Sequence, residues 1–386
     1  MPSDDRTRAV SGQIVSSRRT FLRTAAAATG AFAVAGCAAT APGGRTDTPE
    51  GGRTVTDGVG RTVTVPAEVS RVVCVGPGTL RQVAYLGATD RVVGVERGEK
   101  EFLRRAPYNM ANPELRDRPT IGSTGPNASG NGEEILAVDP DVIFYFGDPS
   151  VATELTDQTN TPVVVLTVVD FLDRDSRQTM YETWRLVGRV LDETDRAETL
   201  VDGVEDVVGD LGARTNDRPE SERRRAYIGA INNKGAKGID TTRNPFPPFR
   251  LTGTENVAAA VESDSASVQV STEKLLAWDP PRAFVSTRNT ERVASELREN
   301  PELRQVSAVA DGEVFKILPY AQYHVNYESI LATSYYVGRT VYPEAFGDVS
   351  VKAKANEVFR LFHDTDLYED LASTFDMFEP LSIPGG

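Results

Sequence analysis

Hydrophobic positions recur every three or four residues in the middle of the chain and predict one long helix over residues 192–214. The apolar stripe consists of Ala197, Leu200, Val201, Val204, Val207, Val208 and Leu211. Asp192 is the expected N-cap, and Gly212 is expected at the end of the helix. A helix of about 20 residues is a rod of roughly 30 Å. Gly203 and Gly209 each cost about 1 kcal/mol relative to alanine, so we expect tertiary packing to hold this rod.

On both sides of the rod, short apolar runs alternate with helical patterns. This alternation predicts an α/β fold with mainly parallel sheets and flanking helices. The first side opens with a hairpin signal at Asp57-Gly58. The predicted strands are 71–75, 91–95, 142–146 and 163–166 on the first side and 226–231, 283–286 and 314–318 on the second. From Glu328 onward the pattern is mostly helical.

A short repeat links the two sides. Residues 133–140 read EEILAVDP, residues 273–280 read EKLLAWDP, and each segment runs directly into a predicted strand. This repeat predicts two similar lobes, joined by the rod, with a ligand cleft between them. The expected organisation is a signal over 1–37, a tether over 38–52, an N-terminal lobe over 53–170, a helical connection over 171–216, and a C-terminal lobe with a helical tail over 217–386.

The N-terminus carries the pattern of an export signal. Ser17 to Leu22 reads SRRTFL, a twin-arginine motif, and an alanine-rich apolar run follows it. The run ends in Val-Ala-Gly-Cys, which resembles a lipobox and predicts lipidation of Cys37. Two acyl chains there would hold the protein stably on a membrane. We therefore expect the folded part to work outside the cytoplasm, anchored to the outer face of the cell membrane.

Composition narrows the function further. The net charge of -14 argues against nucleic-acid binding, and an acidic, lysine-poor surface suits high salt. Two cysteines cannot build a disulfide framework, and Cys74 is expected to be a buried structural thiol. No phosphate loop is present, and two histidines in the whole chain suggest neither a metal cluster nor a catalytic triad. The chain therefore does not read as an enzyme.

Several motifs, in this order, resemble those of a known family. They are Arg71 to Val73 with Gly76 to Thr79, Glu133 to Ile143, Gly253 to Ala258, and Tyr335 to Phe346. The chain resembles the helical-backbone (class III) solute-binding proteins of ABC importers, which capture ferric siderophores, haem and cobalamin, and within them a branch predicted to handle metal complexes. The resemblance implies a monomer without a cofactor that serves a permease and its ATPase. It also implies permease docking through Glu133 and Glu273, with Glu134 as the competitor in the first lobe.

We expect the ligand contacts in loops at the cleft, because such loops follow the strands of this fold. The candidates in the first lobe are Thr79, Arg81, Tyr108, Ser123, Thr124, Asn127 and Asp148. Those in the second lobe are Asn233, Lys234, Arg243, Phe246, Phe249, Arg250, Arg288, Tyr320, Tyr323 and His324. Residues 241–250 are expected to be an exposed aromatic loop suited to a bulky planar or anionic complex.

The arginines favour an anionic ferric siderophore as the ligand, and no certain metal ligand is assigned. Tyrosine and histidine can ligate iron, but packing between the lobes is the alternative role for Tyr320, Tyr323 and His324. Cobalamin, haem or a metal ion remain alternative ligands. A ligand receptor that is not coupled to transport is the alternative function.

Overall fold

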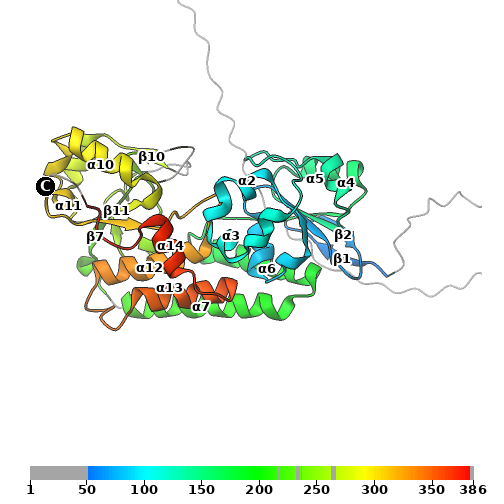
Figure 1. Cartoon of the computed structure of the whole chain (residues 1–386). Helices are drawn as coiled ribbons and strands as arrows, with labels where there is room; N and C mark the ends of the chain where they lie inside the picture. The colour runs from blue at the N-terminus through cyan, green and yellow to red at the C-terminus, as the bar shows by residue number, and fades with distance from the viewer. Residues whose placement is uncertain (1–50, 216–217, 232–234, 236, 262–266, 383–386) are drawn as a thin grey trace, which may run out of the picture. The chain divides into compact units, whose positions relative to one another are not determined.

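Two four-stranded parallel sheets make up the frame of the described part of the chain (Figure 1). The computed structural model describes residues 51–215, 218–231, 235, 237–261 and 267–382. The first sheet has the order β4-β3-β5-β6 and the second β12-β11-β7-β9. Both predicted sheets are thus present, and they remain separate.

The first lobe opens with the predicted hairpin, whose two strands pair antiparallel. Its strands are β1 (Arg53–Thr56), β2 (Thr62–Val65), β3 (Val72–Val75), β4 (Val92–Gly94), β5 (Val142–Tyr145) and β6 (Val163–Val165). Its helices are α1 (Thr79–Tyr85), α2 (Arg97–Lys100), α3 (Pro107–Ala111), α4 (Gly132–Ala137) and α5 (Pro149–Thr159), with 3-10 turns η1 (Thr89–Arg91), η2 (Phe102–Arg105) and η3 (Pro113–Asp117).

The second lobe follows the same plan and ends in a helical tail, as predicted. Its strands are β7 (Arg225–Gly229), β8 (Thr241–Thr242), β9 (Glu255–Asn256), β10 (Val268–Gln269), β11 (Ala283–Ser286) and β12 (Val314–Ile317). Its helices are α8 (Pro247–Leu251), α9 (Thr272–Trp278), α10 (Thr290–Glu299) and α11 (Ser307–Ala310), with 3-10 turns η4 (Glu220–Glu222), η5 (Thr287–Asn289) and η6 (Leu303–Gln305). The tail consists of α12 (Tyr327–Val341), α13 (Val351–His363) and α14 (Tyr368–Phe375).

The strand orders match the repeat found in the sequence. If the strands of each sheet are numbered along the chain, the first sheet has the spatial order 2-1-3-4 (β4-β3-β5-β6). The second sheet has the same order when it is listed from β9 (β9-β7-β11-β12). The two repeated octapeptides form α4 and α9, and each helix leads into the third strand of its sheet. The prediction of two similar α/β lobes is confirmed.

The helical connection consists of two helices, α6 (Arg174–Leu191) and α7 (Thr194–Thr215). The prediction that Asp192 is an N-cap was wrong. It is the C-cap of α6, in a left-handed conformation with φ 58°, which aspartate adopts more readily than most residues, and its carboxylate accepts from Arg53. Gly212 lies inside α7, which runs on to Thr215.

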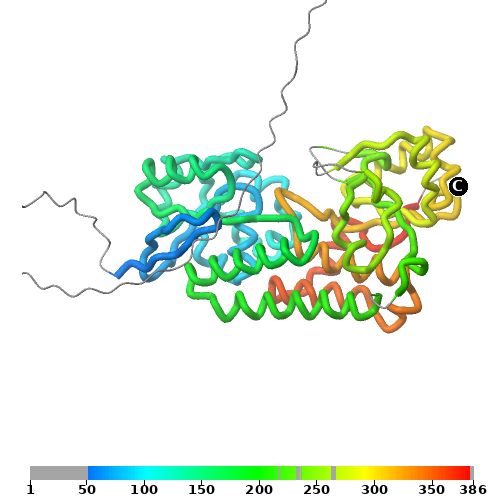
Figure 2. The backbone as a smooth tube through the Cα atoms, turned by 180° about the vertical axis from the view of Figure 1, so that it is seen from behind, coloured from blue at the N-terminus to red at the C-terminus, as the bar shows by residue number. Residues whose placement is uncertain are grey.

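The rod α7 carries the predicted apolar face and packs along the tail (Figure 2). Its contacts include α6 on the side of the first lobe and α8, α12 and α13 on the side of the second. Val207 and Val208, at the margin of the stripe, are only partly buried.

Alternate residues of the strands belong to different hydrophobic cores, as the two-residue period of a strand requires. Val72 and Cys74 face a shared core, whereas Val73 and Val75 face a separate cluster under α4 and α5. The shared core also takes Phe284 of the second sheet and most of α12. One hydrophobic core therefore underlies both lobes. Burial also raises the pKa of the Cys74 thiol well above its usual range, in agreement with a structural role.

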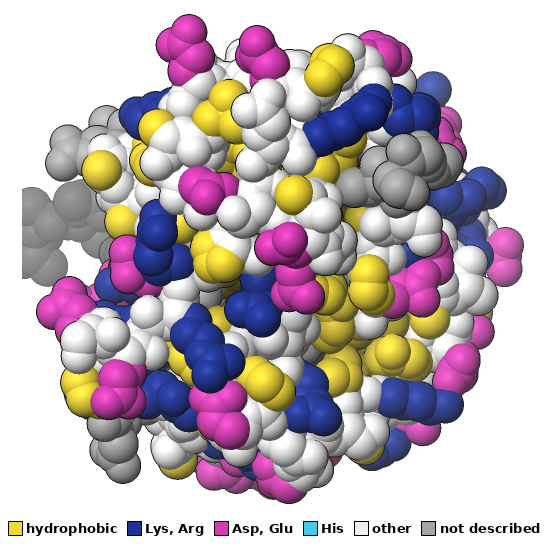
Figure 3. All heavy atoms as spheres, turned by 90° about the vertical axis from the view of Figure 1, so that its left-hand side faces the viewer, with side chains coloured by type: hydrophobic (Ala, Val, Ile, Leu, Met, Phe, Trp, Pro, Cys, Tyr) yellow, Lys and Arg dark blue, Asp and Glu magenta, His cyan; other side chains and the backbone are white. Residues whose placement is uncertain are grey.

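The surface mixes charges of both signs. On the face in Figure 3, acidic and basic side chains lie interspersed. Across the described ranges, no helix is both long enough and apolar enough to cross a bilayer. Residues 1–50, which hold the predicted signal, Cys37 and most of the tether, lie outside the described residues.

Candidate ligand site at the junction of the lobes

Both sheets change their strand order at equivalent points. In the first lobe β4 lies on one side of β3 and β5 on the other, and β7 has the same central place in the second lobe. In open parallel sheets, ligands bind beyond the carboxyl ends of the two strands that flank such a switch. The loops after β3 and β5, and those after β7 and β11, are therefore the expected ligand loops.

Two glycines of the first lobe allow a close approach at this edge. Gly76 has φ +97°, and a Cβ atom there would lie 2.1 Å from the carbonyl oxygen of Phe146. Gly78 has φ +81°, and its Cβ would lie 3.0 Å from Cβ of His324, a residue of the second lobe. The predicted glycine-rich loop therefore lies where the lobes meet. Thr79 is buried there, and its hydroxyl donates to the Gly76 carbonyl over 2.8 Å.

Two hydroxyl groups at the end of β11 have no hydrogen-bond partner within the described part of the chain. They belong to Ser286 and Thr287, whose exposed fractions are 2% and 9%. Nearby, the amide nitrogen of Asn289 donates to the Ala230 carbonyl over 2.8 Å and ties the ends of β7 and β11 together. Buried polar atoms are nearly always bonded, so these two hydroxyls are candidate ligand contacts.

A strained turn follows β12 at the same junction. Tyr323 and His324 have φ values of 51° and 86°, in the left-handed region that costs a non-glycine residue about 1–3 kcal/mol. The backbone N–H of Gln322 donates to the His324 carbonyl over 2.9 Å, and this bond closes the turn. Gln322 Nε2 and His324 Nδ1 are buried without a partner among the described residues. Strain of this kind typically accompanies a binding site.

Arg81, a predicted ligand contact, holds this turn from the other lobe. Its Nη1 donates to the Val325 carbonyl and its Nη2 to the Gln322 carbonyl, each over 2.7 Å. The guanidinium also stacks on Tyr108, 4.8 Å from the ring centre. Arg81 is 1% exposed, and its Nε has no partner in the described ranges.

Two buried carboxyls lie near the glycine-rich loop and Tyr108, and the sequence analysis did not single them out. Glu96 accepts from the Gly76 amide over 3.2 Å, and burial raises its pKa to about 8. Glu99 accepts from Tyr108 over 2.6 Å and from Asn109 over 2.8 Å, and burial raises its pKa to about 7. The predicted ligand residue Tyr108 is thus buried and bonded. Glu96 comes almost directly after β4, and that position was a usable signal.

The side chains of Tyr323 and His324 contact the first lobe. The Tyr323 hydroxyl donates to the Gly125 carbonyl over 3.1 Å, and the His324 ring meets Phe146 edge to face at 5.5 Å. Burial lowers the pKa of His324 to about 4, so its imidazole is neutral at pH 7. Both residues therefore pack between the lobes, the alternative role considered for them.

A second polar bridge joins the lobes through Arg243. Its guanidinium donates to Asp170, which follows β6, and to the Tyr320 hydroxyl. Tyr320 in turn donates to Asp170 over 3.4 Å. The predicted residues Arg243 and Tyr320 are thus brought together and hold the lobes in contact.

Two arginines from opposite lobes lie close to each other near the end of β11. Arg288 directly follows the unpartnered Thr287, and its side chain is in part exposed. Desolvation and then the neighbouring Arg105 of the first lobe lower the pKa of Arg288. Two like charges from opposite lobes favour an anion between them.

The other first-lobe candidates are exposed or have local roles. Ser123 and Asn127 are exposed, and the Thr124 hydroxyl accepts from the Gly98 amide over 2.6 Å. Asp148 caps α5 by accepting from the Ser150 amide over 2.9 Å. Asn233 and Lys234, candidates of the second lobe, lie outside the described residues.

The expectation of an exposed aromatic loop at 241–250 was wrong. Phe246 and Phe249 are each 1% exposed and meet edge to face at 5.1 Å inside the shared core. Residues 247–251 form α8, which packs against α12, and Arg250 is the exposed residue of that helix. Neither ring is available to a ligand.

The predicted docking carboxylates are both exposed. Glu133 lies in the first turn of α4 and Glu273 in the first turn of α9. Glu133 borders a surface pocket of about 460 Å³ that Leu136, 50% exposed, also lines. Equivalent helices therefore present one carboxylate on each lobe.

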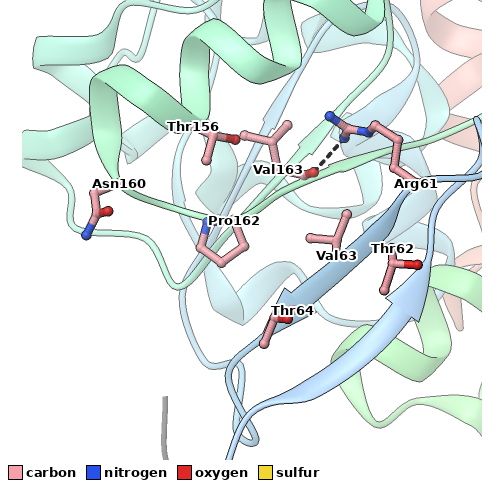
Figure 4. Close-up of a pocket in the computed structure, with 8 residues that line it drawn as sticks. All are labelled: Arg61, Thr62, Val63, Thr64, Thr156, Asn160, Pro162 and Val163. Atoms are coloured by element: carbon pink, nitrogen blue, oxygen red, sulfur yellow. Dashed lines mark hydrogen bonds between the residues drawn. The ribbon is translucent and has the colours of Figure 1, made fainter. Parts of the chain in front are cut away.

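A different pocket, of about 320 Å³, lies away from the strand ends, between the hairpin and the segment that leads into β6 (Figure 4). Arg61 stands at its rim and donates to the Val163 carbonyl over 2.9 Å. The other lining residues are threonines, valines, a proline and an asparagine, so Arg61 is the charged residue of this lining. In the ranges that the structure describes, no three His, Cys, Asp or Glu side chains are close enough to hold a metal ion.

Known proteins share this architecture. The chain is 26% identical over 328 residues to the molybdate-binding protein MolA of Haemophilus influenzae, covering 80% of this chain and 90% of the relative. The solved structure of MolA bound to molybdate matches with a TM-score of 0.64 at 25% identity, over 81% of this chain and 98% of that chain.

More distant relatives bind other metal complexes. A Fe(3+)-citrate-binding protein of Bacillus subtilis is 23% identical over 65% of this chain and 74% of its own length. A cobalamin-binding protein of Halobacterium salinarum is 25% identical over 66% and 64%, respectively. Residues 72–321 match the family model described as periplasmic binding protein. The chain therefore belongs to the periplasmic binding protein family, and its fold is that of the binding proteins of ABC importers.

Proposed function

We propose that the protein captures a compact anionic metal complex at the junction of its lobes and delivers it to an ABC permease outside the cytoplasm. The observation that carries this proposal is the set of buried, unpartnered donors on Ser286, Thr287 and Gln322. Arg288 and Arg105 add positive charge near the end of β11. Hydroxyl, amide and guanidinium donors together suit an oxygen-rich anion.

Three ligands share this chemistry. Molybdate and ferric citrate are bound by relatives of the chain, and an anionic ferric siderophore is the ligand favoured by the sequence. The buried positions of Phe246 and Phe249 remove the aromatic support expected for a bulky planar ligand. This favours the smaller anions, molybdate first, over haem and cobalamin.

Calorimetric titration of the full chain tests the proposal. Molybdate, ferric citrate, a ferric siderophore, haem and cobalamin are titrated separately, with sulfate as a tetrahedral anion that lacks a metal. We expect micromolar or tighter binding of one of the three anionic metal complexes, with an affinity that falls as salt rises. Binding of haem or cobalamin alone, or of none of the five, contradicts the proposal.

Charge removal supplies a second test. Replacing Arg105 and Arg288 together by glutamine is expected to weaken binding by about tenfold or more. Arg104→Gln is the matched control, because Arg104 is an exposed neighbour of Arg105 in η2. An unchanged affinity in the double variant excludes the arginines from the site.

The proposal also includes the membrane anchor. Lipidation of Cys37 would keep the protein at the cell surface beside its permease and ATPase. Mass spectrometry of the protein from the membrane fraction should find acyl chains on residue 37, and Cys37→Ala should release the protein from the membrane. A membrane-bound Cys37→Ala variant contradicts lipid anchoring.

A further inference from the structure

We infer that Arg81 is a positioning residue for the ligand site: it acts from the first lobe by locking the strained turn Gln322–Val325 of the second. The turn contains the unpartnered atoms Gln322 Nε2 and His324 Nδ1. The expected effect on ligand affinity rests on the proposed function. The expected effect of Arg81 on the conformation of the turn does not.

The contacts of Arg81 explain how the turn is held. Its two terminal nitrogens bond the carbonyls of Gln322 and Val325, which flank the two left-handed residues. A bidentate guanidinium fixes the two carbonyls at a set separation, which a single ammonium group cannot do. The conformational cost of Tyr323 and His324 is therefore offset by bonds that come from the other lobe.

The surroundings hold Arg81 itself in one place. Its guanidinium stacks on Tyr108, and Tyr108 donates to Glu99. The side chain is almost fully buried, so it has little freedom to leave the turn. Gly78 has no side chain, and this leaves room for His324, because a Cβ atom at position 78 would lie 3.0 Å from the Cβ of His324.

This arrangement links the relative placement of the lobes to recognition. Bonds within the turn also hold it, but the two from Arg81 cross between the lobes, so contact between the lobes favours this conformation. Separation of the lobes would remove these two bonds and loosen the placement of Gln322 Nε2, a donor of the proposed site. Arg81 thus couples the contact between the lobes to ligand affinity.

Hydrogen exchange without ligand tests the structural part. In Arg81→Gln we expect faster exchange of the Gln322 and Asn326 amides, which donate to His324 and Tyr320 within this turn, with little change in α7. Arg196→Gln is the matched control. Arg196 also donates to two carbonyls, those of Tyr85 and Leu361, but it does not touch the turn. Equal exchange in the turn of Arg81→Gln and wild type overturns the inference.

Ligand affinity tests the functional part, with molybdate and ferric citrate as probes. Arg81→Gln is expected to lose about tenfold or more in affinity, Arg81→Lys less, and Arg196→Gln nothing. If Arg81→Gln does not fold, the affinity of Gln322→Leu is measured in its place. This variant should fold and should lose about tenfold or more in affinity for the probe. Wild-type affinity in Gln322→Leu, or equal losses in the Arg81 and Arg196 variants, overturns the inference. If the wild type binds neither probe, the ferric siderophore replaces them; failure to bind all three contradicts the proposed function instead and leaves the exchange test to judge Arg81.

Discussion

We expect the hydroxyls of Ser286 and Thr287, which have no partner among the described residues, to lower the stability of the folded protein, because burial removes their hydration without a replacing bond. Thr287→Val and Ser286→Ala should therefore each raise the free energy of unfolding by about 1 kcal/mol while weakening ligand binding. Urea denaturation and calorimetric titration of the same samples measure the two effects.

Thr252→Val is the control for this prediction. The Thr252 hydroxyl is buried but donates to the Pro248 carbonyl over 2.8 Å. Its loss should cost about 1 kcal/mol and leave the affinity unchanged. If Thr287→Val is less stable than wild type, the hydroxyl has a partner after all and the ligand-site interpretation loses its basis.

Glu96 gives the protein a specific pH dependence. Its pKa rises from an ordinary 4.5 to about 8 on folding, so the folded state holds this proton more tightly. Its contribution to stability is therefore complete below about pH 4.5 and is lost as the pH rises towards about 8.

Glu96→Gln cannot ionise, so it should gain roughly 1–4 kcal/mol relative to wild type between about pH 5 and pH 8. Urea midpoints at several pH values measure this gain. Glu101→Gln, an exposed acid near Glu96, serves as the control and should follow the wild-type profile. Parallel profiles for Glu96→Gln and wild type would show that the folded protein does not retain the proton.

At the scale of the element, α7 contains two glycines in different settings. A methyl group on Gly209 meets nothing within 4 Å, whereas one on Gly203 would lie 2.4 Å from Leu361 of α13. Gly209→Ala should stabilise the protein by about 1 kcal/mol, the difference in helix propensity. Gly203→Ala should stabilise it less or destabilise it, because the Leu361 side chain has to move. Thermal melts of the two variants make the comparison, and an equal gain in both would show that α13 does not press on α7.

The elements themselves were largely predictable. Period and alternation placed the strands, the hairpin and α7, because burial of one face imposes these patterns directly. Asp192 was misassigned because aspartate suits both an N-cap and a left-handed C-cap, and the sequence does not show which helix it belongs to.

The site was less predictable, because it depends on contacts between distant segments. No sequence pattern shows that Arg81 bonds residues more than 240 positions away, or that the hydroxyl of Thr287 lacks a partner. Phe246 and Phe249 follow a turn-rich stretch that reads as a loop, yet the shared core buries them. Propensity is a local property, and tertiary packing overrides it.

At the scale of the whole molecule, Glu133 and Glu273 form a candidate pair for docking. Each is exposed in the first turn of an equivalent helix, one per lobe, so a permease could read both lobes at once. Glu133→Lys with Glu273→Lys should abolish uptake in reconstituted vesicles and leave ligand affinity unchanged.

A matched control separates docking from a general charge effect. Glu154→Lys with Glu291→Lys reverses one exposed carboxylate on each lobe at other positions and should preserve uptake. Glu134→Lys tests the alternative residue in the first lobe. Uptake by the Glu133 and Glu273 double variant at the wild-type rate would remove the docking proposal.

Because the shared hydrophobic core lies under both sheets, the groups of the proposed ligand site are held in place before a ligand arrives. A small anion then gives up its own freedom of movement on binding, but it does not have to order loops or side chains as well. Few contacts can therefore yield a long residence time. Under the proposed function, release to the permease then requires that binding to the transporter favour a conformation in which the lobes separate.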